Sequence, residues 1–246
     1  MRLLILAILI AISGPAAAVG SLADLSVYDR SEGRQLPVYW HQGRAWVAGR
    51  PGNEYELRLR NRQGDDVLAV LSVDGVNVIT GETATVQQSG YVLGARRALE
   101  VRGWRKDLTR TAAFYFTTLG DSYAARTGRP DNLGAIGAAL FRRKAPEPVP
   151  YSEVAPAAPF AKAQAGDAAA AAARSAEAPL GTGHGRGETS HARRVAFERA
   201  TREPAETVVI YYDSYQNLVA RGVIPRPLPL PQAPNPFPGF VADPPA

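Results

Sequence analysis

Three consecutive residues, Gly120-Asp121-Ser122, are of types used in nucleophilic catalysis. They follow an apolar run, 112–116, that predicts a strand, and a turn of small residues comes after them. A strand that ends in a tight turn can present a serine hydroxyl to a substrate. Such a serine also needs a general base oriented by an acid, together with an oxyanion hole.

The partners that Ser122 would need are not evident in the sequence. Hydrolases of the GDS type take the base from an Asp-x-x-His motif near the C-terminus. Here the later histidines are His184 and His191, and neither lies three residues after an aspartate. We therefore predict that Asp121 and Ser122 cap a turn through side-chain to backbone hydrogen bonds. The alternative is a serine hydrolase of the esterase type that uses Ser122 with His184.

The histidines also raise the question of a metal site. His184 and His191 flank Glu188, a spacing that can hold zinc on a loop. The glycines at 181, 183, 185 and 187 predict a flexible loop, and no third strong ligand is nearby in the sequence. The same stretch lacks the Lys-Ser/Thr pair of a phosphate-binding loop. We predict no metal and no cofactor.

Pairs of carboxylates could support glycoside hydrolysis. The acids considered are Asp74, Glu82, Asp121 and Asp213. Asp74 and Glu82 each lie next to a glycine in an expected turn, which already accounts for them. A β-sandwich of this size contains that many acids by chance, so no catalytic pair is predicted.

A binding surface is the function class that the aromatic and arginine residues favour. Exposed aromatic rings beside guanidinium groups suit the stacking of sugars or the binding of an anionic wall polymer. Core filling is the competing explanation, above all for Trp46 and Trp104. The candidate binding residues are Trp40, Arg102, Trp104, Arg105, Tyr123 and Arg126.

The elements that must position these residues are strands. Residues 53–61 alternate, with Tyr55, Leu57 and Leu59 on one face, which is typical of a half-buried antiparallel strand. Asp74-Gly75 between two β-branched runs predicts a tight hairpin. Further short strands follow at close spacing, and helical periodicity is absent. The sequence predicts an all-β fold, with an antiparallel, jelly-roll-like β-sandwich body over residues 25–143.

The composition changes beyond this body. Residues 144–179 are rich in Ala and Pro and predict a disordered linker. Residues 180–225 predict two strands, 194–200 and 206–214, and a short C-terminal helix closed by Gly222 and Pro225. Because so few elements make a poor domain, we expect this segment to dock on the body. Residues 226–246 predict a Pro-rich, disordered tail.

The N-terminus and the composition bear on the compartment. Arg2, the apolar run 3–12 and the small residues 16–18 are typical of a cleaved secretory signal peptide, residues 1–18. An uncleaved inner-membrane anchor is the alternative. The chain has no cysteine and a net charge of +5, which is too small to indicate a nucleic-acid partner without a clustered patch. We expect a periplasmic or secreted protein that does not span the membrane after cleavage.

Several longer segments resemble a group of uncharacterised exported or envelope proteins of Gram-negative bacteria. They are VDGVNVITGETA, GDSYAARTGRPDN, GTGHG and YYDSYQNLVARGVIP, and the resemblance covers most of 36–225 apart from the linker. That group has no activity we can carry over, so the resemblance implies only that the segments on both sides of the linker belong together. The expected function is a non-enzymatic envelope protein that acts by binding or assembly. Its partner would be another envelope protein or a cell-wall polymer.

Overall fold

The computed structural model describes residues 18–145 and 179–226. The expected signal peptide, linker and Pro-rich tail lie almost entirely outside these residues. The fold class is confirmed: the described chain is built mainly of strands, in two seven-stranded sheets that we call sheet I and sheet II.

Sheet I and sheet II share the strands of the expected body. The spatial order of sheet I is β10-β11-β5-β1-β2, with β13 paired to β11 and β9 paired to β5. The bounds of its strands are β1 (Ala23–Asp29), β2 (Arg34–Gln35), β5 (Glu54–Asn61), β9 (Ala98–Val101), β10 (Gly103–Arg105), β11 (Arg110–Thr118) and β13 (Leu180–Thr189).

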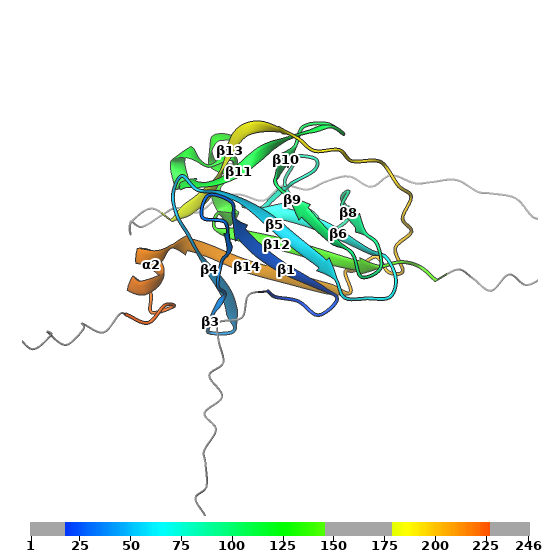
Figure 1. Ribbon diagram of the computed structural model, residues 1–246, viewed down its shortest axis with the longest axis horizontal. Helices are drawn as coiled ribbons and strands as arrows, with labels where there is room; N and C mark the ends of the chain where they lie inside the picture. The colour runs from blue at the N-terminus through cyan, green and yellow to red at the C-terminus, as the bar shows by residue number, and fades with distance from the viewer. Residues whose placement is uncertain (1–17, 146–178, 227–246) are drawn as a thin grey trace, which may run out of the picture.

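Sheet II faces sheet I across the core (Figure 1). Its spatial order is β3-β4-β14-β12-β6-β7, with β8 paired to β6. The pairing of β14 with β4 is parallel, which departs from the expected all-antiparallel sandwich. The bounds are β3 (Tyr39–His41), β4 (Arg44–Gly49), β6 (Val67–Val73), β7 (Val76–Asn77), β8 (Tyr91–Leu93), β12 (Ala135–Arg142) and β14 (Glu206–Ser214).

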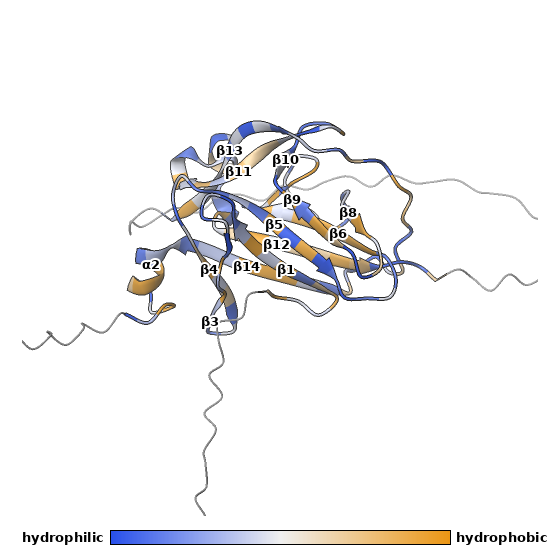
Figure 2. Ribbon diagram, viewed as in Figure 1, coloured by the Kyte–Doolittle hydropathy of each residue, from blue (hydrophilic) through white to orange (hydrophobic). Residues whose placement is uncertain are grey.

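Alternating side chains build the core between the sheets. Along β5 the residues Tyr55, Leu57 and Leu59 point inward and are buried, as the sequence predicts. Figure 2 shows apolar residues along the strands of both layers. The largest fully buried side chains of the main core include Tyr55, Phe114 and Phe116 from sheet I, and Ile136, Leu140 and Tyr212 from sheet II.

The predicted Asp74-Gly75 hairpin is confirmed between β6 and β7. Both turn residues have positive φ, 52° for Asp74 and 72° for Gly75. Glycine adopts this conformation without strain, and aspartate tolerates it.

The Gly-rich stretch 181–187 is a strand, so its prediction as a flexible loop was wrong. It forms most of β13 and pairs along β11. A Cβ on Gly183 would overlap the ring of Tyr115, and one on Gly181 would press on Ser122. Glycine is therefore required at positions 181 and 183, because the side chains of Ser122 and Tyr115 lie against this face of the strand.

The prediction of a strand over 194–200, the first of the two expected in this segment, was also wrong. Those residues form an extended connection with one isolated bridge, Arg143 to Arg199. The strand over 206–214 and the helix after it are confirmed as β14 and α2 (Tyr215–Ala220). Ser214 caps α2 by accepting a hydrogen bond from the amide of Asn217. Leu218 is the buried residue of this helix.

Short helical turns connect β11 to β12. They are η1 (Leu119–Asp121), α1 (Tyr123–Arg126) and η2 (Pro130–Asn132). Within the two described ranges, no helix has the length and apolar character needed to cross a membrane.

Candidate functional site

Ser122 is a buried helix cap. Its Oγ donates to the carbonyl of Leu119 at 2.8 Å and accepts from the amide of Ala125 at 3.1 Å. This is the N-cap arrangement, so the predicted capping role is confirmed. The predicted side-chain to backbone bond is wrong for Asp121, whose carboxylate instead accepts a hydrogen bond of 2.9 Å from the hydroxyl of Thr118.

His184 does not serve as the base of Ser122. The imidazole is exposed, and its Nε2 lies 3.4 Å from the ammonium of Lys106. No hydrogen bond joins His184 to Ser122, although the structure describes both residues. The geometry that the hydrolase alternative requires is therefore not formed.

His184 instead ends a stack of rings that runs from the core to the surface. The buried Trp104 donates its indole N–H to the carbonyl of Gly183 at 3.1 Å. The ring of Tyr123, the first residue of α1, lies 4.9 Å from that of Trp104 and 5.5 Å from that of His184. Tyr123 and His184 are accessible to solvent, so the stack offers an aromatic face at the corner where β10, β13 and α1 meet.

Three cationic side chains surround these rings. Lys106 follows β10, Arg126 ends α1, and the guanidinium of Arg129 lies 5.9 Å from the centre of the Tyr123 ring. Arg129 is fixed by a 2.8 Å hydrogen bond to the carbonyl of Gly81. In the described part of the chain none of the three makes an ion pair with a carboxylate. We call Trp104, Lys106, Tyr123, Arg126, Arg129 and His184 the basic-aromatic patch.

The charges of the basic-aromatic patch act on His184. Burial is the main cause that lowers the pKa of the imidazole below its usual 6.5, and the positive charges of Lys106 and Arg126 lower it further. At neutral pH the ring is therefore uncharged and its Nε2 accepts from Lys106. The positive charge of the patch comes from the lysine and the arginines, while Tyr123 and His184 supply stacking surface.

The predicted binding residues fall into two groups. Trp104, Tyr123 and Arg126 do gather at the basic-aromatic patch, although Trp104 is only 4% exposed and supports Tyr123 from beneath. Sequence reasoning missed Lys106 and Arg129 as members. The local signal was a cation two residues after Trp104 and another six residues after Tyr123.

The other predicted binding residues lie outside the patch or are already engaged. Arg105 donates to the Tyr91 hydroxyl and to the carbonyl and hydroxyl of Ser190, which fixes the end of β13. Arg102 forms ion pairs with Glu56 and Glu100. Trp40 is 56% exposed but belongs to β3, in the opposite sheet.

The considered acids do not form a catalytic pair. Asp213 is buried and accepts from the Ser214 amide and the side chain of Asn217. Glu82 is an exposed acceptor of the Gln88 side chain. Asp74 is buried as well. Its place in the turn explains its backbone conformation but not the burial of its carboxylate.

The Asp74 carboxylate is the end of a polar chain that crosses the core. It accepts from the Tyr212 hydroxyl at 2.6 Å and from the amides of Thr182 and Gly134 at 2.7 and 2.9 Å. The Thr182 hydroxyl lies 2.6 Å from that of Tyr212 and 2.7 Å from that of Tyr55. Burial raises the pKa of Asp74 from its usual 3.8 to about 6, against the opposing effect of these hydrogen bonds. This chain of hydrogen bonds ties the two sheets together, and its groups are buried away from any ligand at the surface.

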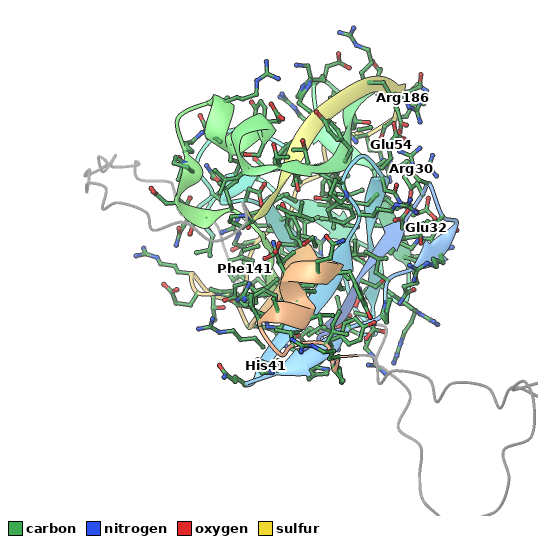
Figure 3. All side chains as sticks on the ribbon, turned by 90° about the vertical axis from the view of Figure 1, so that its left-hand side faces the viewer. Arg30, Glu32, His41, Glu54, Phe141 and Arg186 are labelled. Carbon is green, nitrogen blue, oxygen red and sulfur yellow. The ribbon has the colours of Figure 1, made fainter. Side chains whose placement is uncertain are left out.

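Charges around Arg30 on the outer face of sheet I are balanced. Arg30 pairs with Glu54 at 3.4 Å and with Glu188 at 2.9 Å, and Arg186 pairs with the same two glutamates. Arg30, Glu54 and Arg186 lie side by side in Figure 3. Because Arg30 and Arg186 each have carboxylate partners, this ladder of ion pairs is structural rather than a site for a charged ligand.

A hollow of 670 Å³ lies beside the connection that follows the end of β13, lined by Gln87 and residues 199–203. The guanidinium of Arg199 is occupied there, because it donates to the carbonyls of Val86 and Gln88 and covers the ring of Phe141. Few side chains are left to converge on a ligand.

No metal centre is evident in residues 18–145 and 179–226, where no three His, Cys, Asp or Glu side chains gather as ligands would. Comparisons with protein-family models, with curated proteins and with solved structures found no match. The resemblance to exported proteins of Gram-negative bacteria therefore stays a prediction.

Proposed function

We propose that this chain is a non-enzymatic, exported envelope protein that binds an anionic polysaccharide of the cell wall through the basic-aromatic patch. The observation that carries the proposal is the convergence of Lys106, Arg126 and Arg129 on the Tyr123–His184 rings without a carboxylate partner among the described residues. Export rests on the N-terminal sequence.

The chemistry of the patch fits an acidic sugar polymer. The rings of Tyr123 and His184 offer flat surfaces on which a sugar ring can stack. The guanidinium groups of Arg126 and Arg129 suit carboxylates, because their donors form a planar fork. The patch is a surface corner rather than an enclosed pocket, which favours a segment of a long chain over a small molecule.

The proposal is tested by calorimetric titration with polygalacturonate, a polymer of acidic sugars, and with dextran as the uncharged polymer. We expect polygalacturonate to bind and dextran not to bind. Removal of two charges, in the double variant Lys106→Gln/Arg126→Gln, should weaken binding by up to about thirtyfold, since each exposed contact contributes up to about 1 kcal/mol. The matched control is Arg60→Gln, which removes an exposed arginine of β5 in sheet I.

Three results would count against this function. Equal binding of dextran would show that charge is not used. Unchanged binding by the double variant would place the site elsewhere. A binding constant that does not fall as salt rises from low to physiological concentration would exclude an electrostatic contact.

A further inference from the structure

A second cavity lies on the outer face of sheet II, away from the basic-aromatic patch. It measures 280 Å³ and is lined by His41, Gln42, Arg44, Trp46, Arg221 and Val223. The hairpin of β3 and β4 forms one wall, and the end of α2 forms the other. Figure 3 places His41 at the bottom of the molecule, below α2.

Trp46 is the unusual member of this cavity. The side chain is 6% exposed, and its indole N–H is buried without a hydrogen-bond partner. The indole of Trp104, by contrast, donates to the carbonyl of Gly183. A buried donor with no partner is destabilising, so a ligand that supplies an acceptor at this position gains affinity from satisfying it.

Positive charge gathers around the same indole. His41 and Arg44 lie directly opposite each other across the hairpin. The guanidinium of Arg44 lies 5.4 Å from the centre of the Tyr211 ring, and that of Arg221 lies 4.4 Å from Trp46. Arg221 also forms an ion pair with Asp213, and its Nη1 lies 3.4 Å from that carboxylate. Arg44 makes no ion pair within the described ranges.

We propose that this cavity binds a small carboxylic acid. One carboxylate oxygen accepts the N–H of Trp46, and the other pairs with the guanidinium of Arg44. The hydrocarbon part of the acid lies against Val223 and the indole ring. The cavity volume is near the lower end for small-molecule sites, which limits the ligand to a few carbon atoms. The planar fork of the Arg44 guanidinium matches the geometry of a carboxylate.

The experiment uses the three tryptophans as separate reporters. In a ¹⁵N–¹H correlation spectrum each indole gives one side-chain signal, and the variants Trp40→Phe and Trp46→Phe assign them. Glutarate is the probe, glutaramide is its uncharged analogue, and inorganic phosphate is the competing anion. We expect glutarate alone to shift the Trp46 signal in a saturable manner and to slow its exchange with water. The signals of Trp40 and Trp104 should stay in place.

Variants test the assignment of the partners. Arg44→Gln should weaken the glutarate response at least about tenfold, while Arg60→Gln should leave it unchanged. Unmoved Trp40 and Trp104 signals show that either variant is folded. The proposal is overturned if glutarate leaves Trp46 unchanged, if glutaramide or phosphate acts equally well, or if Arg44→Gln responds like the wild type. None of these results bears on polygalacturonate binding, which uses other residues.

Discussion

The hydroxyl of Tyr212 donates a hydrogen bond of 2.6 Å to the carboxylate of Asp74 inside the sandwich. Tyr212 belongs to β14 and Asp74 to the turn after β6, so the bond connects segments 138 residues apart in the chain. Since burial places the pKa of Asp74 at about 6, this carboxyl changes its charge in a pH range where most carboxyls are already ionised.

Asp74 makes the fold less stable as the pH rises from about 4 to about 6. In this window the folded state keeps a proton that the unfolded chain has lost, so raising the pH favours unfolding by about 2 kcal/mol from this group. Asp74→Asn removes that dependence. We expect the variant to be less stable than the wild type, with a deficit that shrinks by about 2.5 kcal/mol between pH 4 and pH 7. Urea denaturation at both pH values measures it, and an equal deficit would contradict the shifted pKa.

Tyr212→Phe should raise the pKa of Asp74 further, because the hydrogen bond from Tyr212 lowers it. The pH window in which stability falls should therefore move upward, and the loss of the hydroxyl should cost about 1–3 kcal/mol. Tyr55→Phe is the matched control, since the Tyr55 hydroxyl bonds to Thr182 and not to the carboxylate. Denaturation as a function of pH distinguishes them. If stability falls over the same pH window in both variants, the Tyr212 hydroxyl does not lower the pKa of Asp74.

Gly183→Ala should destabilise the protein by about 1–3 kcal/mol, because the new methyl group would overlap the ring of Tyr115. Gly187 lies on the same face of β13, but a Cβ added there would have no atom within 4 Å. Gly187→Ala should therefore be close to neutral. Thermal unfolding compares the two. In the Tyr115→Ala background, where the ring is absent, Gly183→Ala should cost less stability than it does in the wild type. Equal stability of both glycine variants would show that Tyr115 does not constrain this strand.

Ser122→Ala should cost about 1 kcal/mol through the loss of the cap on α1. A serine-directed fluorophosphonate probe should not label the wild-type protein, since Ser122 Oγ is occupied by Leu119 and Ala125. Labelling that disappears in both Ser122→Ala and His184→Ala would restore the hydrolase alternative.

Binding of polygalacturonate should strengthen as the pH falls below the usual 6.5 of histidine. His184 becomes a cation in that range, at a pH lower than usual because burial, Lys106 and Arg126 depress its pKa. His184→Asn should remove the gain while keeping the binding at neutral pH. Calorimetric titration at pH 5 and pH 7.5 tests this, and an unaltered pH dependence in the variant would exclude His184 from the contact.

Local rules of sequence account for the features that depend on neighbouring residues. The alternation in β5, the Asp74-Gly75 turn, the cap at Ser122 and the start of α2 after Ser214 all have their causes within a few positions of the chain. The sequence therefore predicts the class of the fold and several of its strands.

Other features depend on residues far apart in the chain, which no local pattern contains. The glycines of β13 indicate a loop until Tyr115 is seen lying on them. The Asp74 carboxylate is explained only by Thr182 and Tyr212, which arrive from the far side of the linker. Lys106 and Arg129 join one site because β10 and the connection after α1 meet at a corner of the sandwich.

β14 lies between β4 and β12, although it follows every other strand of sheet II along the described chain. A nascent chain that has reached only residue 205 therefore has two half-sheets, with the edges of β4 and β12 unpaired. Sheet II is completed only when β14 has left the ribosome. Folding of this sheet therefore ends after its other strands have been translated. For the exported protein that we propose, this late closure of sheet II would leave the chain incompletely folded while it is threaded through a narrow translocation channel.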